Sequence, residues 1–93
     1  MNELDQARVT IDRVDQEMAR LYCERMEAVR QVARYKKERG IPILDEERER
    51  QVIEKNSTRV EDETLRSYYA LFLQDLMKNS RAYQADLMQE KEN

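Results

Sequence analysis

One uninterrupted stretch, residues 2–39, most constrains what this chain can fold into. Glycine and proline, the residues that usually end a helix, do not occur before Gly40. Apolar side chains recur in this stretch at alternating steps of three and four residues, so they share one face of a helix. They are Leu4, Ala7, Ile11, Val14, Met18, Leu21, Ala28 and Val32, and Arg25 occupies the position of the series between Leu21 and Ala28. The pattern predicts one helix of roughly ten turns, about 55 Å long, whose apolar seam packs against another helix.

The rest of the chain predicts two shorter helices. Gly40 and Pro42 end the first helix, and Asp45 is a candidate N-cap for the next one. The second helix is expected at about residues 46–55, and the third at about residues 61–89 after a polar break. We therefore predict an all-α fold, with three helices in a single domain that spans the whole chain, residues 1–93. The apolar face of the third helix is expected to comprise Leu65, Tyr69, Phe72, Leu76, Tyr83 and Leu87.

The size of the chain predicts that the long helix needs a second subunit. Charged and hydrophobic residues each make up 40% of the sequence, which holds one glycine and one proline, a composition typical of long helices. A lone core is marginal at 93 residues, and a helix of this length cannot fold back on itself. We expect an intertwined homodimer in which the two long helices pair antiparallel.

Several classes of function are disfavoured by composition. The net charge of -3 argues against a nucleic-acid or anionic-membrane surface, and no apolar run is long enough to span a membrane. The N-terminal sequence has no signal-peptide character, which predicts a cytoplasmic protein. The chain has no histidine, and Cys23 is its single cysteine. The commonest general base and metal ligand are therefore missing, and we expect neither a metal nor another cofactor.

Polar side chains interrupt the apolar faces of all three predicted helices. They are Arg8, Arg25 and Lys36 on the first, Arg48 and Glu49 on the second, Ser80 and Gln84 on the third, and Asp45 where the second begins. Each has a purely structural explanation: an exposed edge position, a pairing contact that sets register, or a solvated face.

Helix geometry favours a shared role for these residues. Arg25 and Lys36 are eleven residues apart, which is three turns and about 20° of rotation, so they face the same way. Arg8 lies roughly 25 Å along the axis from Arg25, too far to share a small ligand within one chain. If two long helices pair antiparallel, Arg8 of one chain reaches the Arg25 end of the other, and two identical pockets form. Such a pocket suits a small dianion with a hydroxyl group, and chemistry that needs only positioning and charge stabilisation.

The order of these residues resembles that of chorismate mutases of the all-helical class. The resemblance covers Arg8 to about Leu87, nearly the whole chain. It rests on Arg8, Asp15, Arg25, Lys36, the Gly-Ile-Pro-Ile stretch at residues 40–43, Asp45, the Arg48–Glu49 pair, Ser80 and Gln84.

The resemblance implies a Claisen rearrangement of chorismate to prephenate in phenylalanine and tyrosine biosynthesis, without acid, base, covalent or cofactor chemistry. Lys36 and Gln84 match the residues that hydrogen-bond the ether oxygen. Arg25, and Arg8 from the partner chain, match the carboxylate clamps. The remaining matches are Arg48 at the enolpyruvyl end, Asp45 and Glu49 near the ring hydroxyl, and Ser80 at the ring carboxylate.

Two alternatives stay open at the level of sequence. An isochorismate–pyruvate lyase resembles the mutase in fold and in pocket cations, and an assay with each substrate separates the two. A non-catalytic helical dimerisation module would use the charged seam for pairing specificity alone. In such a module Arg25, Lys36 and Gln84 would pair with protein carboxylates rather than with a ligand.

Overall fold

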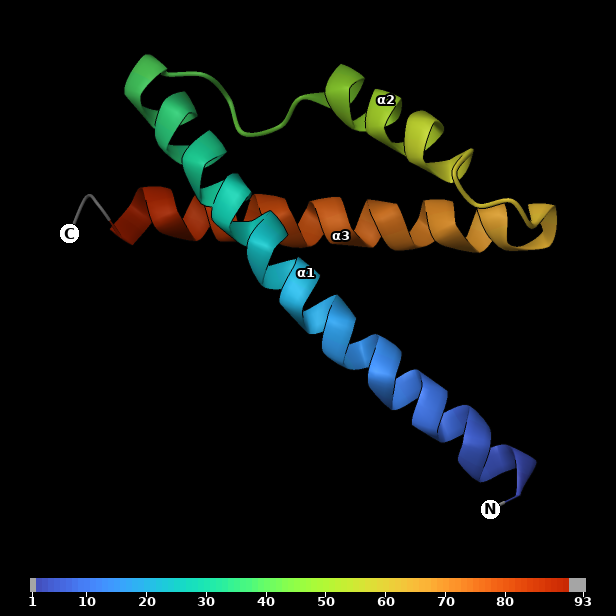
Figure 1. Ribbon diagram of the computed structural model, residues 1–93. Coiled ribbons are helices and arrows are strands. Elements are labelled where there is room, and N and C mark those ends of the chain that lie inside the picture. Colours follow the sequence, from blue (N-terminus) through green and yellow to red (C-terminus); the bar gives the residue numbers. More distant parts are fainter. Residues whose placement is uncertain (1, 91–93) are drawn as a thin grey trace.

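The chain forms three helices that confirm the all-α prediction. The computed structural model describes residues 2–90, apart from the side chain of residue 90, and within them there are three helices and no strand. These are α1 (Glu3–Arg39), α2 (Glu46–Ser57) and α3 (Glu63–Glu90). Each predicted boundary lies within two residues of the observed one. The arrangement is flat and elongated, with extents of 54 × 29 × 14 Å (Figure 1).

Both ends of α1 are fixed by local hydrogen bonds. The Asn2 side chain accepts a hydrogen bond from the Asp5 backbone N–H at 2.8 Å, which satisfies a donor that the first turn leaves unpaired. At the other end Gly40 adopts φ 64° and ψ 30°, a left-handed conformation that favours glycine. The Ile41 N–H then donates back to the Lys36 carbonyl oxygen at 2.9 Å. The predicted stop at Gly40 is therefore confirmed.

The N-terminal half of α1 projects away from the rest of the chain (Figure 1). Every residue from Asn2 to Glu24 is exposed, including the apolar seam, where Leu4 and Ile11 each retain 55% of their surface. The C-terminal half instead crosses α3, and Ala33 is buried there. One long helix thus has a packed half and an exposed half, and the exposed half reaches α3 at its end, where the Tyr22 hydroxyl donates to Oδ1 of Asn79 at 2.5 Å.

The short helix α2 lies along α3 on the same side as the C-terminal half of α1 (Figure 1). Its N-cap is Asp45, whose side chain accepts a hydrogen bond from the Arg48 backbone N–H at 3.0 Å. This confirms the predicted cap. Because α1 and α2 each pack against α3, the third helix is the element on which the other two are positioned.

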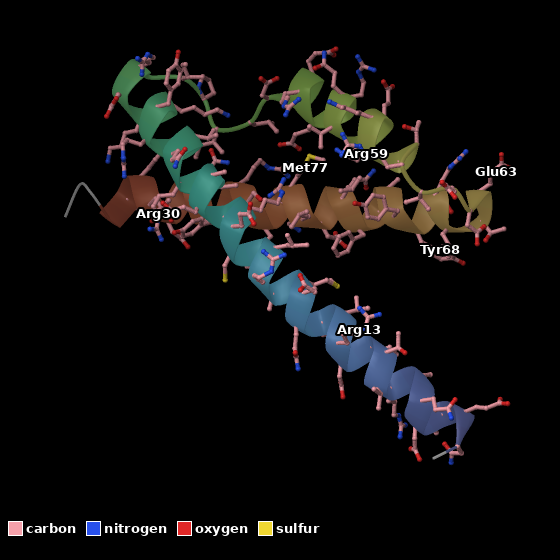
Figure 2. All side chains as sticks on the ribbon, in the orientation of Figure 1. Arg13, Arg30, Arg59, Glu63, Tyr68 and Met77 are labelled. Carbon is pink, nitrogen blue, oxygen red and sulfur yellow. The ribbon has the colours of Figure 1, made fainter. Side chains whose placement is uncertain are left out.

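A single stripe of buried residues runs along α3. Leu73, Met77, Ser80 and Gln84 are all 7% exposed or less, and their spacing of four, three and four residues places them on one face. Figure 2 shows Met77 on the side of α3 that faces α2, with Tyr68 on the opposite side. The stripe is apolar over its first two members and polar over its last two.

The predicted apolar face of α3 is therefore only partly the buried one. Leu65 and Phe72 remain 51% and 46% exposed, whereas Leu73 and Met77, which the prediction omitted, form the core. Two apolar stripes lie side by side on α3, and periodicity alone does not tell which of them the chain uses for itself. No helix in the described part of the chain is long and apolar enough to cross a membrane. The cytoplasmic location stays a prediction.

Candidate active site

A cavity of about 180 Å³ lies where the C-terminal half of α1, the connection after it, α2 and α3 meet. Seven of the eight predicted site residues line it: Arg25, Lys36, Asp45, Arg48, Glu49, Ser80 and Gln84. Its apolar walls are Val29, Val32, Ile43, Val52 and Met77. The structure brings these polar residues together from all three helices, although they span sixty positions of sequence.

Arg25 is held in the cavity by α3. Its Nη1 donates to the Ser80 hydroxyl oxygen at 2.5 Å, and that hydroxyl donates in turn to the Leu76 carbonyl oxygen at 3.0 Å. The Ser80 hydroxyl therefore already uses its one proton within α3. In this arrangement Ser80 orients the guanidinium of Arg25, and it does not offer a hydrogen to a ligand unless the hydroxyl rotates.

Lys36 is anchored by the chain that follows α1. Its Nζ donates to the Ile43 carbonyl oxygen at 2.8 Å, so the connection after Gly40 folds back over the end of the helix. An ammonium group has three donors, and this contact uses one of them. The remaining protons are available to a ligand in the cavity.

The short helix α2 contributes charges of both signs. Its N-cap Asp45 and the first-turn residue Arg48 line the cavity, and the Asp45 carboxylate is fixed by the hydrogen bond that it accepts from the Arg48 backbone N–H. Glu49 forms an ion pair with Arg81 of α3, a residue that also lines the cavity. Four cationic and two anionic side chains therefore line the walls, which gives an excess of two positive charges.

Gln84 is, like Ser80, a buried neutral side chain on the cavity wall. It is 7% exposed, and its Oε1 is buried without a hydrogen-bond partner among the described residues. A buried amide that leaves part of its hydrogen-bonding capacity unused is costly in a core. Its position on the wall of a cationic cavity is consistent with a ligand-binding amide.

Arg8 does not line this cavity. It lies in the exposed half of α1, on the part of the helix that no other element of the chain covers. This location agrees with the distance argument from the sequence, and nothing within a single chain brings Arg8 to Arg25. Its predicted contribution from a partner subunit stays a prediction.

Arg81 is the polar residue that the sequence prediction missed. It follows Met77 by four residues and precedes Gln84 by three, so it lies near the buried face of α3. That spacing was a usable signal. Arg81 does not itself interrupt the predicted apolar face of this helix, however, so the apolar period alone does not single it out.

The cavity offers fixed charge and hydrogen-bond donors rather than reactive groups. No group of three or more histidine, cysteine, aspartate or glutamate residues in the described part of the chain could hold a metal ion. Cys23 is exposed, and it is not among the residues that line the cavity. The arrangement therefore suits binding of a small dianion and electrostatic stabilisation of charge that develops on it.

Comparison with known proteins decides the family. A profile of the family described as chorismate mutase type II matches residues 7–85 of this chain. The chain belongs to the chorismate mutase type II family. The matched segment contains all eight predicted site residues.

A curated relative carries the same family name. It is the bifunctional chorismate mutase/prephenate dehydratase of Aquifex aeolicus (strain VF5), which is 40% identical over 55 residues. The similarity covers 59% of this chain and 15% of the relative, so the chain corresponds to a small part of that longer protein. No solved structure matched the chain.

Proposed function

We propose that this chain is a chorismate mutase that converts chorismate to prephenate in phenylalanine and tyrosine biosynthesis. The observation that carries the proposal is the convergence of seven polar side chains on one cationic cavity in a chain of the chorismate mutase type II family. Chorismate is a dianion with a ring hydroxyl, and the excess of two positive charges on the walls matches its charge.

The proposed reaction is an intramolecular rearrangement. The ether C–O bond breaks while a C–C bond forms, and no proton or electron is taken from the protein. Negative charge builds on the ether oxygen in the transition state. Lys36 and Gln84 are assigned as the donors to that oxygen, because groups aimed at developing charge lower the barrier more than they strengthen substrate binding.

The remaining residues are assigned to hold the substrate in its reactive conformation. Arg25 binds one carboxylate, and Ser80 supports it through the hydrogen bond described above. Arg48 binds the enolpyruvyl end, and Asp45 and Glu49 lie near the ring hydroxyl. Fixing both ends of a flexible substrate removes conformational freedom before the reaction, which is a large part of catalysis without reactive groups.

We also infer an antiparallel homodimer in which Arg8 completes the cavity of the partner. The single chain exposes 7618 Å², whereas a folded monomer of 11.3 kDa exposes about 5700 Å². The excess is about 1900 Å² for each chain. This is about as large as the total surface that a stable interface buries on both partners together. An apolar groove of about 340 Å³ also lies between α1 and α3, and it is lined by Met18, Leu21, Tyr22, Arg25, Tyr69, Phe72 and Leu76.

The contacts within the cavity favour this function over a dimerisation module. In such a module Arg25, Lys36 and Gln84 would pair with protein carboxylates. Arg25 instead donates to a serine hydroxyl, and Lys36 donates to a backbone carbonyl, so both retain their charge for a ligand.

The deciding experiment follows loss of chorismate and of isochorismate, separately, with the purified protein alone. We expect prephenate from chorismate, the same rate after treatment with EDTA, and no need for an added cofactor. Pyruvate release from isochorismate with no turnover of chorismate would assign the lyase activity instead. Absence of turnover and of binding with both compounds would favour the non-catalytic module.

A further inference from the structure

One ion pair connects two helices across the cavity wall. The guanidinium of Arg81 on α3 donates to Oε1 of Glu49 on α2. The Arg81 side chain is 31% exposed and the Glu49 side chain is 24% exposed. In the described part of the chain, every other ion pair joins residues no more than four positions apart. The members of those pairs are 40% or more exposed. The Arg81–Glu49 pair is therefore both long-range and partly shielded from water, the conditions in which an ion pair is screened least.

Without Arg81, Glu49 would be poorly suited to a site for a dianion. Its carboxylate shares the cavity with that of Asp45, the N-cap of α2, and with the cations Arg25, Lys36 and Arg48. A free carboxylate here would repel the negative charges of the ligand, because like charges a few ångströms apart in a shielded site interact strongly. A glutamate side chain with no anchor would also lose rotamer freedom when a ligand bound to it.

We propose that Arg81 is a positioning residue for substrate binding that acts through Glu49. It neutralises the carboxylate and fixes its rotamer through Oε1, and it leaves Oε2 to accept a hydrogen bond from the ring hydroxyl of the substrate. This inference rests on the proposed function. It assigns to Arg81 no direct contact with the substrate, in contrast to Arg25 and Arg48.

The proposal makes a specific prediction for a double-mutant cycle. In Arg81→Met the KM for chorismate rises about tenfold while kcat changes less than about threefold, because a contact to the hydroxyl acts on substrate and transition state alike. Glu49→Gln raises KM by a similar factor. In the Glu49→Gln background, Arg81→Met adds less than about a twofold further change, since its partner is already altered.

Two further variants separate a positioning role from a merely structural one. Arg81→Lys keeps the charge but not the planar donor geometry, so its KM falls between those of the wild type and Arg81→Met. Lys78→Met removes one positive charge from the exposed side of the same helix, away from the cavity, and leaves KM and kcat unchanged. All rates are compared well below the melting temperature of each variant.

Each other outcome overturns the inference in a recognisable way. Equal and additive losses in both backgrounds would show that Arg81 contacts the substrate itself. A lower melting temperature with unchanged KM and kcat in Arg81→Met would show that the ion pair only joins α2 to α3. A wild-type chain that neither converted nor bound chorismate would overturn the proposed function as well, whereas an active wild type with either of the first two results would overturn this inference alone.

Discussion

The two halves of α1 use the same helical geometry for different purposes. Residues 3–24 present an apolar seam that is exposed along its whole length. Residues 25–36 cross α3, and they direct Arg25 and Lys36 into the cavity. In Figure 2, Arg13 marks the free half and Arg30 the half that crosses α3.

This contrast is what the proposed homodimer requires of one small chain that supplies both an interface and a site. An antiparallel pair of long helices would lay the free half of each chain on the packed half of the other. The seam would then gain a partner, and the cavity would gain Arg8, through the same contact. Assembly of the dimer and completion of the site are proposed to be one event. Loss of the dimer and loss of activity can be measured separately in the variants that follow.

The largest effect is expected from a charge in the seam. Ile11→Asp would place a carboxylate in the interface twice per dimer, at about 2 kcal/mol for each copy, which weakens the dimer roughly 1000-fold. Light scattering and sedimentation measure the change. Gln16→Asp, which adds the same charge about 140° around the helix, is the matched control and should leave the dimer intact. A wild-type chain that stayed a folded monomer at low micromolar concentration would refute the homodimer.

The next largest effect is expected on kcat, from substitutions in the packed half of α1 and on α3. Lys36→Ala or Gln84→Ala should lower kcat by about 10²–10³ because each removes one donor to the developing charge. Lys37→Ala is the matched control, since the Lys37 amine donates to the Met88 carbonyl oxygen and does not line the cavity. Steady-state kinetics with thermal melts separate loss of catalysis from loss of folding. Normal turnover in either site variant would remove that residue from the ether-oxygen contacts.

A third prediction tests a residue from each half of α1 in one experiment. Arg8→Ala and Arg25→Ala homodimers should each be nearly inactive, because both of their cavities lack one clamp. When the two variants are unfolded and refolded together, about half of the dimers are mixed, and each mixed dimer has one complete cavity. Activity should therefore return towards roughly a quarter of the wild-type value. If mixed dimers formed and no activity returned, Arg8 would not be supplied by the partner.

The smallest effect is expected for charges that face solvent. The pKa of Glu47 is lowered from its ordinary value of 4.5, mainly by its hydrogen bond with Arg50. A lowered pKa stabilises the fold above the unfolded value, and this contribution is lost as the pH falls through the folded value. Glu47→Gln should thus melt slightly lower than wild type at pH 7, the difference should begin to shrink as the pH falls below 4.5 and disappear once it has passed the lowered folded value, and kcat should not change. A clear loss of activity would contradict an outward-facing role.

The sequence predicts most of the fold because local signals determine it. The apolar period, the left-handed glycine at Gly40 and the cap at Asp45 act within a few residues of themselves, and all three were recognised correctly. The buried face of α3 was assigned wrongly in part, because the choice between Phe72 and Leu73 depends on where two other helices lie. The apolar period of one helix does not determine how that helix packs against distant segments of the chain.

The candidate site was predictable to a similar degree and for a similar reason. Arg25 and Lys36 stood out as cations on an apolar face, so their spacing could be tested by helix geometry alone. Arg81 did not stand out, because it does not interrupt the apolar face predicted for the third helix. The catalytic roles of these residues and the contribution of Arg8 remain predictions, since a single chain holds neither a substrate nor the second subunit.

The cap at Asp45 has a consequence for how this protein can change. One carboxylate starts a helix and borders the cavity, so selection for a folded chain and selection for ligand recognition act on the same side chain. Asparagine would preserve the cap and remove the charge, whereas glutamate would keep the charge and lose the short reach that capping requires. No single replacement supplies both properties. Evolution of a new ligand preference at this edge of the cavity is therefore restricted to side chains that can also cap α2, such as asparagine, serine and threonine.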